Sequence, residues 1–472
     1  MRTSGARNIS IRVAIPIDLA SIQFPTSETP FRSSLVTASL VHQAIPQAYH
    51  FGQLTRAPGQ IKYKTLSWPL VAIVMIAEIV SNGMLSLPSS LAVVGLLPGL
   101  LLILFLGIFA TYTSWLLVGF KLRHPDVHNM GDAGLILFGR AGRELLAFGT
   151  VVFAVCATGG QLLAGQIALT KLSDGRLCLM LATGIFALPT LACSFPRTLD
   201  RLGWISIPSV ISILVAGVVG MVGAGLHPVT EREVNLARSS SFYATFVSIT
   251  NPVFSYAGHF MFFILVSEMR RPQDAMKAAY TLQIFATTFY AVFAVVVYVY
   301  IGNGVTSPAF SSLDPVWMKA AYGIAIPNFL IAGSLYAHTA SKLFFVRFFR
   351  NSRHLYSHTL TGWSVWTILI LVTNGAAFVL AVGVPIFSYL IGIAASLFAS
   401  WYTYGLAGAF WLHDSYHDGD GVRTWRRKWF QATLSIATLV AGAFMCVAGT
   451  YVTIRGIVDA YSSGAVGAPF SC

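Results

Sequence analysis

The chain has 472 residues, of which 56% are hydrophobic and only 10% are charged, and its mean hydropathy is +0.71. Soluble domains carry about 25% charged residues, so this composition excludes a soluble globular protein and indicates one that crosses a membrane several times. The formal net charge of +13 does not indicate a nucleic-acid-binding protein, because the basic residues lie between apolar segments, where they set the orientation in the membrane.

The first 60 residues differ from the rest of the chain. They are rich in Pro, Ser and Thr, contain spaced arginines and hold only two acidic residues. Mitochondrial transit peptides share this composition, but Pro16 and Asp18 interrupt any amphipathic helix. We therefore expect residues 1–60 to form a disordered cytosolic tail, residues 61–455 a membrane domain and residues 456–472 a short C-terminal tail.

The first apolar segment, residues 66–97, contains a break in its middle. It is long enough to span a bilayer, which takes about 20 residues, but Ser81, Asn82 and Gly83 follow shortly after a lone carboxylate, Glu78. A polar break at mid-depth is tolerated only where protein or a water-filled cavity receives the freed backbone groups. A discontinuous helix of this kind is typical of the binding site of a secondary transporter.

The hydropathy pattern from Lys64 onward predicts an all-α protein with eleven membrane-spanning segments. Short basic or Gly-, Pro- and Asp-rich loops separate them, and the long loop 124–143 contains an amphipathic piece. The predicted spans are 66–95, 97–120, 145–170, 176–193, 204–226, 244–267, 275–301, 320–346, 361–382, 385–412 and 431–454.

The charges between these spans predict a cytoplasmic N-terminus. On that side lie 19 Lys and Arg residues, against 6 on the other side, with the N-terminal tail not counted. Cytoplasmic loops carry the excess of basic residues in membrane proteins. The one Asn-x-Ser/Thr sequence, at Asn8, then stays in the cytosol, away from glycosylation.

The sixth predicted span contains a second break. It reads FVSITNPVFSYAGHFMFFILVSEM, in which Pro252 removes a backbone donor and Gly258 eases the backbone. Transporters with inverted repeats place broken helices at corresponding positions of their two halves. Two breaks five spans apart therefore predict a transport site, although Pro and Gly kinks without function also occur in membrane helices.

The residues around both breaks resemble a known family. The runs AEIVSNGMLSLPSSLAVVGLLPG, KLRHPDVHNMGDAG and NPVFSYAGHFMFFILVSEMRRPQDA look like the amino acid/auxin permease (AAAP) family, and the chain is most similar to its fungal neutral amino acid permeases. The resemblance implies a LeuT-like (APC) fold, a five-plus-five inverted repeat with discontinuous first and sixth helices and an extra eleventh helix. It also implies proton-coupled uptake of amino acids. The family usually has a small residue at the position of Asn82.

An α-amino acid presents a carboxylate and an ammonium group, so its site needs fixed donors and fixed acceptors. The amides freed at the first break lie at the N-terminal end of the second half-helix, where the helix dipole favours an anion. We expect the substrate carboxylate to bind there, at Ser81, Asn82, Gly83 and Met84.

The carbonyls freed at the second break suit the substrate ammonium, because they end the first half of the sixth span. They are those around Phe254, Ser255 and Tyr256, next to Gly258. The rings of Phe254 and Tyr256 are also candidates for selecting the substrate side chain.

Three further residues are weaker candidates for the binding site. Tyr336 and Tyr389 would contribute to selectivity, although aromatic residues in membrane helices commonly serve packing or the interface belt. Gln161, in the third span, would contact the ligand or form a hydrogen bond between helices.

Coupling to an ion gradient requires a further group inside the membrane. Glu78 is the acidic residue that lies well within a predicted span, and an ionised carboxylate there costs about 2.5–3.5 kcal/mol. Glu78 is therefore a candidate proton-coupling residue, or a partner in a structural pair. His259 is the second candidate, unless it hydrogen-bonds the unwound backbone.

A coupling sodium ion is the alternative to the proton. Thr339 and Ser341 would ligate it, or the ammonium of Lys342 would occupy its place between the eighth and first helices. Lys342 would otherwise extend to the membrane interface.

No sequence pattern indicates a cofactor, a resident metal or an enzyme. The cluster 413–420, HDSYHDGD, lacks the spacing of a calcium loop and is expected to be a solvated polar turn. HExxH and GxSxG are absent from the sequence, and the five cysteines match neither a zinc pattern nor a disulfide framework.

These observations lead to one main hypothesis and one from another class. The first is a proton-coupled importer of neutral, aliphatic or aromatic, amino acids in the plasma membrane, with the vacuolar membrane or sodium coupling as variants. The second is a receptor that binds an amino acid without transporting it. The expected partners are the amino acid and the lipid bilayer, and nucleic acid is not among them.

Overall fold

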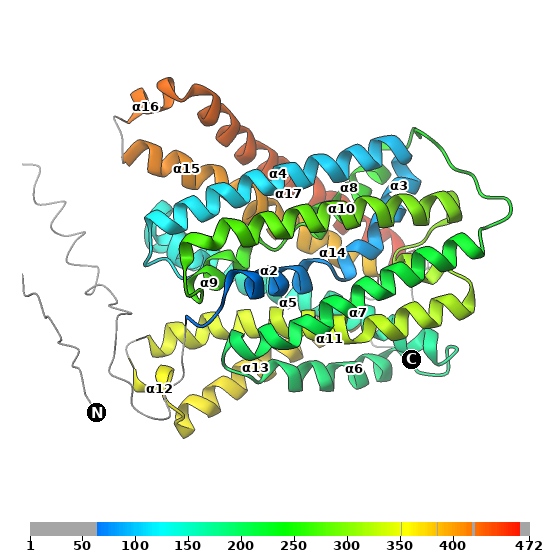
Figure 1. Ribbon diagram of the computed structural model, residues 1–472, viewed down its shortest axis with the longest axis horizontal. Helices are drawn as coiled ribbons and strands as arrows, with labels where there is room; N and C mark the ends of the chain where they lie inside the picture. Colours follow the sequence, from blue (N-terminus) through cyan, green and yellow to red (C-terminus); the bar gives the residue numbers. More distant parts are fainter. Residues whose placement is uncertain (1–63, 351, 385, 418–420, 463–472) are drawn as a thin grey trace, which may run out of the picture. The chain divides into compact units, whose positions relative to one another are not determined.

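The computed structural model describes residues 64–350, 352–384, 386–417 and 421–462 (Figure 1). The tail predicted for residues 1–60 lies outside these residues. Within them the regular secondary structure is helical, and the one β-type contact is an isolated bridge between Leu66 and Met269. The all-α fold class is therefore confirmed.

The predicted spans correspond to the observed helices, in the same order. Ten helical segments among the described residues are long and apolar enough to cross a membrane. The fourth span forms α6, whose 16 residues make it about 24 Å long and shorter than the others. The long helices are α4 (Leu96–Arg123), α5 (Met130–Leu172), which contains a kink, α7 (Leu199–Leu226), α10 (Ala275–Ile301), α11 (Pro315–Phe349), α13 (Leu360–Gly383) and α17 (Trp429–Ser462), and α6 is Leu179–Ser194.

Three spans consist of several helical pieces. The first comprises α2 (Trp68–Ile79), the 3₁₀ turn η1 (Asn82–Ser86) and α3 (Leu87–Val94), and the sixth comprises α8 (Phe242–Ser255), η2 (His259–Met261) and α9 (Phe262–Ser267). The tenth contains a π-helix, η6 (Ala395–Gly405), between α14 (Phe387–Ala394) and α15 (Leu406–His417). The short helices η3, α12 and α16 cover Pro272–Asp274, Arg353–Tyr356 and Val422–Arg427, and η4 and η5 cover Gly302–Gly304 and Ala309–Ser312.

Helix ends follow local capping signals. The Asn129 side chain accepts a hydrogen bond from the amide of Asp132 at the start of α5, and the Thr359 side chain accepts one from the amide of Gly362 at the start of α13. Such caps satisfy amides that have no partner inside the helix. The amphipathic piece expected within 124–143 is the first part of α5, which ends in a kink at Gly139, where φ is +67°. Only glycine adopts that conformation without strain.

The two broken spans occupy the interior of the bundle. In their most apolar windows, 89% of the first span and 94% of the sixth are buried, against 28% of α17 and 33% of α7. A helix that is apolar all round and buried on every side belongs to the core. The outer helices instead present large apolar side chains, such as Ile108, Leu188 and Val447, on the exposed surface.

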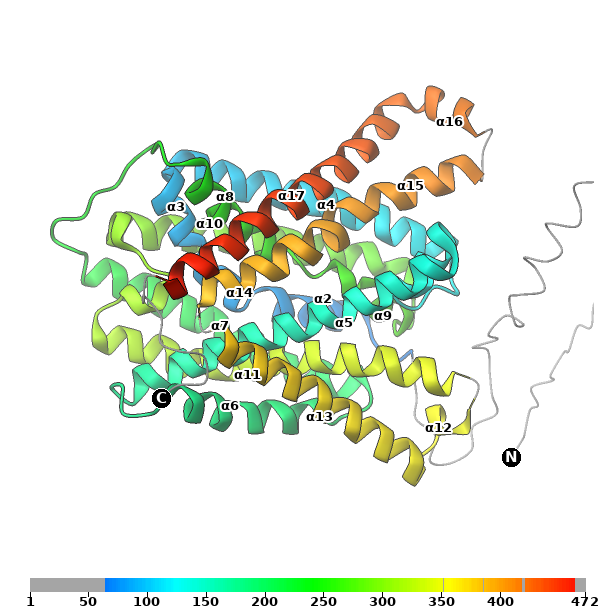
Figure 2. The ribbon, with the colours of Figure 1, turned by 180° about the vertical axis from the view of Figure 1, so that it is seen from behind.

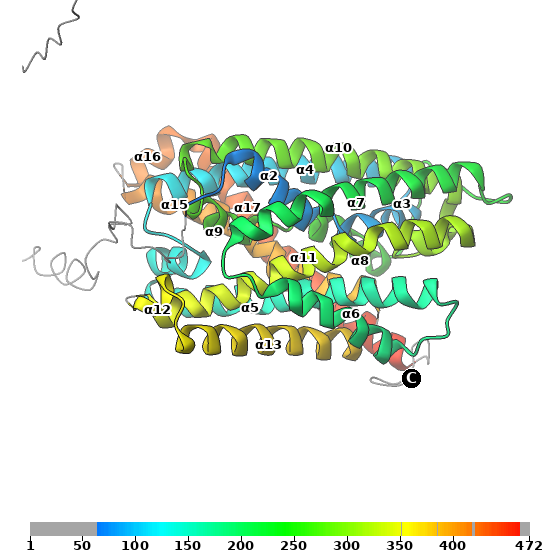
Figure 3. The same ribbon diagram turned by 60° about the horizontal axis from the view of Figure 1, so that its bottom comes forward.

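Two groups of helices surround these broken spans. On one side α11 packs against α5, α7 and α13, and on the other α10 packs against α4 and α2. Figure 2 shows the molecule from behind, and Figure 3 shows α13 and α10 on opposite sides of the other helices. The last helix, α17, packs against η6 and α15 and continues to Ser462, past the boundary expected at residue 455.

Candidate functional site

The first break begins where α2 ends at Ile79. The amide of Val80 still bonds the carbonyl of Ile76 at 2.8 Å, but Ser81 then leaves the helical conformation, with φ −146° and ψ −133°. The chain resumes as a 3₁₀ turn from Asn82 onward. The sequence prediction of a discontinuous helix is therefore confirmed here. Of the four amides expected to bind a carboxylate, that of Ser81 bonds the carbonyl of Ile79 at 2.9 Å and that of Met84 bonds the carbonyl of Ser81 at 3.2 Å, which leaves the first two amides of η1.

The second break follows Pro252 in α8. This helix ends at Ser255, Tyr256 to Gly258 form a turn, and a 3₁₀ turn begins at His259. The hydroxyl of Ser255 donates to the carbonyl of Asn251 at 2.9 Å. The carbonyl of Phe254 accepts from the amide of Ala257 at 2.9 Å, so the carbonyls expected to bind an ammonium already have backbone or side-chain partners in this conformation.

The two breaks touch each other at glycines. A Cβ atom on Gly83 would lie 3.0 Å from the Cα atom of Ser255, and one on Gly258 would lie 2.6 Å from Cγ1 of Ile79. At Gly83 the neighbouring atom is backbone, which cannot move aside as a flexible side chain can, so this position requires glycine for the approach. At Gly258 the neighbouring atoms belong to the side chain of Ile79, which would have to move. The first and sixth spans therefore meet directly at their unwound segments.

The carbonyls that end α2 are held by side chains of α10 and α11. The hydroxyl of Tyr290 lies 2.8 Å from the carbonyl of Ile79 and 2.8 Å from that of Ser255, so it joins the two breaks. The Tyr336 hydroxyl donates to the carbonyl of Glu78 at 3.0 Å, and the Asn328 amide donates to the carbonyl of Ala77 at 3.3 Å. Sequence reasoning missed Tyr290 and Asn328, because a polar residue inside an unbroken apolar helix does not show what it faces.

The third span brings amide groups to the first break. The hydroxyl of Ser81 donates to Oε1 of Gln161 at 3.1 Å, and a Cβ atom on Gly160 would lie 3.1 Å from Nδ2 of Asn82. Both amide nitrogens, Nδ2 of Asn82 and Nε2 of Gln161, are buried and have no hydrogen-bond partner among the described residues. Buried donors without partners are rare in native proteins, and a carboxylate is a ligand that would satisfy them.

Glu78 is buried at the junction of the two breaks. The residue is 1% exposed, and neither carboxyl oxygen has a hydrogen-bond partner in the described part of the chain. Oε1 lies 3.9 Å from the position of a Cβ atom on Gly258. A charged carboxylate in such surroundings is costly unless a cation or a proton neutralises it.

His259 is tied to α4. Its Nε2 atom lies 2.9 Å from the carbonyl of Ala110, 2.8 Å from the hydroxyl of Ser114 and 3.3 Å from that of Thr113. A carbonyl oxygen only accepts, so Nε2 carries a hydrogen. Such an anchor corresponds to the structural alternative that the sequence left open for this histidine.

The aromatic candidates differ in what they contact. The Tyr256 hydroxyl donates to the carbonyl of Ile103 in α4 at 3.1 Å, and Phe254 contacts Phe153 edge-on at 6.5 Å between centroids. Met84 is fully buried. The ring of Tyr389 packs against Gly456 of α17, whereas Tyr336 lies at the first break, as described above.

A buried ion pair joins the end of the sixth span to α11. Lys342 donates to the carboxylate of Glu268, and both residues are less than 10% exposed. This pairing replaces the interface position that was the default expectation for Lys342. Sequence reasoning missed Glu268, because it precedes two arginines and resembles a charge in a loop.

Backbone contacts close the same end of the bundle. The amide of Leu66 bonds the carbonyl of Glu268 at 3.1 Å, and the amide of Arg270 bonds the carbonyl of Leu66 at 2.8 Å. The start of the first span is thus hydrogen-bonded to the end of the sixth. The hydroxyls of Thr339 and Ser341 donate to carbonyls of their own helix.

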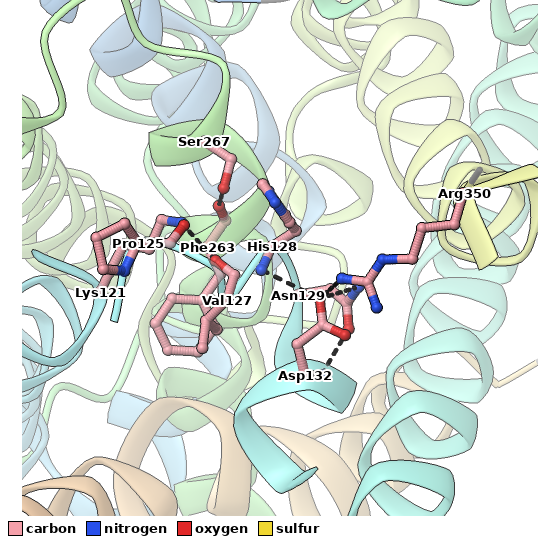
Figure 4. A network of polar contacts seen from close by, with 9 residues as sticks. All are labelled: Lys121, Pro125, Val127, His128, Asn129, Asp132, Phe263, Ser267 and Arg350. Carbon is pink, nitrogen blue, oxygen red and sulfur yellow. Dashed lines mark hydrogen bonds and ion pairs between the residues drawn. The ribbon is translucent and has the colours of Figure 1, made fainter. Parts of the chain in front are cut away.

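The loop between α4 and α5 lies at this end too (Figure 4). Lys121 donates to the carbonyls of Pro125 at 2.7 Å and Val127 at 2.5 Å. Asp132 accepts from the amide of His128 at 3.2 Å and pairs with Arg350 at 3.4 Å. Burial, together with the charges of Lys121 and Arg350, lowers the pKa of His128 to about 3, so this histidine is neutral at physiological pH.

The expectation of a solvated polar turn at 413–420 is wrong for its first half. Residues up to His417 continue α15. Asp414 is 1% exposed, forms an ion pair with Arg123 at 2.8 Å and contacts Nε2 of His124 at 2.9 Å. Within the described ranges no group of three His, Cys, Asp or Glu side chains is arranged to hold a metal ion.

Comparison with known proteins places this arrangement in a family. Residues 64–455 match the family described as "Transmembrane amino acid transporter protein". A "Transmembrane transporter" of Gibberella moniliformis is 31% identical over 87% of this chain and 88% of its own length. An "N amino acid transport system protein" of Neurospora crassa is 28% identical over 88% of this chain and 90% of its own.

A solved structure resembles the chain more distantly. It is a substrate-bound, outward-open Na⁺-coupled sialic acid symporter, which aligns with 81% of this chain and 90% of its own at a TM-score of 0.48 and 10% identity. At that level the likeness carries no information on function. The family match over residues 64–455, in contrast, is informative. The chain belongs to the transmembrane amino acid transporter family, the amino acid/auxin permeases, whose members are transporters rather than enzymes.

Proposed function

We propose that this protein is a secondary active transporter that imports neutral amino acids together with protons across the plasma membrane. The observation that carries the proposal is the position of Glu78. Its carboxyl group is buried where the two breaks meet, and neither oxygen has a hydrogen-bond partner among the described residues. This burial supports a role for the side chain in exchanging a proton next to the substrate.

The substrate lies between the breaks in this proposal. Its carboxylate accepts from the first amides of η1 and from the free side-chain amides of Asn82 and Gln161. Its ammonium faces the end of α8, where Ser255 and Tyr256 terminate the helix and the carbonyl dipoles are negative. A ligand that enters here must separate Gly83 from Ser255, so binding requires a change in the distance between the two breaks.

Coupling follows from the cost of a buried charge. With no proton bound, Glu78 is anionic and is stable only when water or a cation reaches it. Proton binding neutralises the carboxyl group and allows the site to close around the zwitterionic substrate. When the proton is released on the other side of the membrane, Glu78 is charged again and disfavours the closed site. Each closed, substrate-loaded state therefore carries one proton.

Two observations support a cytoplasmic N-terminus. The loops at the end where the first span begins carry most of the basic residues, as expected for the cytosolic side. Cys178, at the opposite end of the bundle, is disulfide-bonded, and disulfides persist in oxidising compartments. The same orientation holds in a vacuolar membrane, which is the alternative location.

Sodium coupling is the second candidate mechanism. It would use Thr339 and Ser341, whose hydroxyl groups donate to the backbone of α11; that of Ser341 also contacts the hydroxyl of Thr373 at 3.2 Å. Lys342 is adjacent to both but is engaged by Glu268, so its ammonium belongs to the closure at the end of the sixth span. The proton mechanism is favoured because the carboxylate of Glu78, unlike the ammonium of Lys342, has no hydrogen-bond partner among the described residues.

The test is uptake of labelled leucine and phenylalanine by the purified protein in liposomes. A proton gradient and a sodium gradient, both directed inward, are imposed separately. We expect concentrative uptake with the proton gradient alone. Uptake that requires sodium would move the coupling site to Thr339 and Ser341, and binding without uptake under either gradient would support the receptor alternative.

A further inference from the structure

Helix α16 and the start of α17 carry a patch of cations and aromatic rings, which we call the basic tip. All its residues are exposed, and Trp429 and Phe430 are 66% and 65% exposed. Figures 1 and 2 show that α15, α16 and the first turns of α17 extend away from the neighbouring helices. The basic tip consists of Arg423, Arg426, Arg427, Lys428, Trp429 and Phe430.

The basic tip is held in place by the opposite face of α16. Thr424 is 6% exposed, and the indole nitrogen of Trp425 donates to the carbonyl of Leu412 in α15 at 3.3 Å. The ring of Trp425 also packs on Tyr416, at 5.7 Å between centroids. Gly421, with φ +59°, provides the reversal that lets α16 fold back. The patch is thus a fixed feature of the fold.

The charges of the basic tip are not compensated within the described chain. None of its four cations forms an ion pair or side-chain hydrogen bond with another described residue. Other arginines at this end are paired, such as Arg123 with Asp414 at 2.8 Å and Arg347 with Glu144 at 2.7 Å. A surface with four unpaired cations in six residues attracts an anionic partner.

The aromatic residues indicate that this partner is a membrane. Trp and Phe rings exposed to water are unfavourable, whereas Trp is enriched at the level of the lipid headgroups. The 34 residues of α17 make it about 51 Å long, against about 30 Å for the hydrocarbon core. Its first turn therefore lies at or beyond the headgroups, where the cations meet phosphate and the rings meet acyl chains.

We propose that the basic tip binds the anionic phospholipid headgroups of the cytosolic leaflet, with Trp429 and Phe430 inserted beneath them. The inference goes beyond transport but uses the orientation proposed above, because anionic lipids are concentrated in that leaflet. A basic side chain near such a surface increases binding about fivefold. The four cations together therefore favour phosphatidylserine over neutral lipid.

The experiment uses the full chain in neutral detergent, titrated with fluorescent phosphatidylserine. The tip variant changes Arg423, Arg426, Arg427 and Lys428 to Gln. A matched control removes the same charge from exposed cations elsewhere on the same side that make no side-chain ion pair with described residues: Arg140→Gln, Arg201→Gln, Arg271→Gln and Arg353→Gln. We expect affinity to fall at least about tenfold in the tip variant and less than about twofold in the control.

Four additional measurements complete the test: two with further variants, and two with phosphatidylcholine and soluble poly-glutamate as competitors. Arg-to-Lys changes at the three tip arginines should preserve binding, because they keep the charge, and Trp429→Ala with Phe430→Ala should weaken it. Phosphatidylcholine should not displace the probe. Equal losses in the tip and control variants, unchanged binding after removal of both rings, or displacement by soluble poly-glutamate as effective as by phosphatidylserine would each overturn the proposal.

Discussion

At the scale of single residues, the site depends on a few polar groups in apolar surroundings. Glu78, Asn82 and Gln161 are almost completely buried, yet each keeps at least one side-chain atom without a hydrogen-bond partner among the described residues. Such atoms lower stability unless a ligand or proton satisfies them. In the proposed mechanism, substrate and proton satisfy these atoms at the first break.

Replacing Glu78 by Gln should separate the two proposed functions of the site, which are proton coupling and substrate binding. The amide keeps the shape but binds no proton, so accumulation driven by a pH gradient should be abolished while exchange of labelled for unlabelled substrate continues. Both activities are measured in the same liposomes. Gradient-driven accumulation at the level of the unchanged protein would show that Glu78 has a structural role only.

Gly83→Val tests the contact between the breaks. A Cβ atom there lies 3.0 Å from the backbone of Ser255, so a branched side chain must push the sixth span away and crowd the amides of η1. Substrate affinity, measured by binding to the purified protein, should fall at least about tenfold, which is about 1.4 kcal/mol. Gly375→Val is the control, because nothing lies within 4 Å of its Cβ position. Unchanged affinity in Gly83→Val would show that the substrate carboxylate does not bind at this break.

The sequence predicted Glu78, Gly83 and Gly258 because a polar residue or a glycine is conspicuous in an apolar run. It could not predict Tyr290 or Asn328, which support the same breaks from α10 and α11. Both lie in unbroken helices, and which face of such a helix meets the break depends on packing across the whole bundle. Partners distant in sequence become visible only when the fold is known.

At the scale of elements, the first and sixth spans are joined at two levels. Tyr290 links their unwound segments, and the strand-like pairing of Leu66 with Met269 links their outer ends. The pair of Lys342 with Glu268 then fixes the sixth span to α11. Transport from this conformation to one open at the same end requires these contacts to separate, so they determine how easily that end opens.

Removing one partner of the buried pair should destabilise the protein more than removing both. Glu268→Gln or Lys342→Met removes the ion-pair partner of one buried charge, which costs about 3–5 kcal/mol, whereas the double variant Glu268→Met with Lys342→Met should recover most of that loss. The readout is thermal unfolding of the protein in detergent. A double variant as unstable as the sum of the single ones would mean that the pair is not coupled.

The loop between α4 and α5 should respond to acid. The pKa of His128 is lowered from 6.5 to about 3 by burial and neighbouring cations. Between these two pH values the unfolded chain binds a proton at His128 and the folded chain does not. Stability from this group is complete above pH 6.5 and is lost as the pH falls toward 3. In His128→Asn the melting temperature should fall less between pH 7 and pH 5 than in the unchanged protein. Parallel pH profiles would show that His128 is protonated when folded.

At the scale of the whole molecule, hydropathy was sufficient to place the spans in order, because each apolar run has to bury itself in lipid or protein. The structure differs in the length of α6, with 16 residues, and in the π-helix Ala395–Gly405. The sequence also predicted that Asp414 is solvated, because it lies in a polar cluster. In the structure it is paired with Arg123 and His124, which are distant in sequence. Charge alone does not reveal a partner that folding supplies.

The orientation of the molecule and its membrane can be tested together. Glu231 and Arg271 are exposed and lie in loops at opposite ends of the bundle, so a cysteine at each reports which side it faces. In intact cells, a membrane-impermeant maleimide should label Glu231→Cys and should label Arg271→Cys only after the plasma membrane is opened. The reverse pattern would invert the topology and contradict the excess of basic residues on the cytosolic side. If Glu231→Cys is protected in intact cells and remains protected when only the plasma membrane is opened, while Arg271→Cys becomes labelled, the protein lies in an internal membrane, and import into the cell is replaced by movement between the cytosol and an organelle.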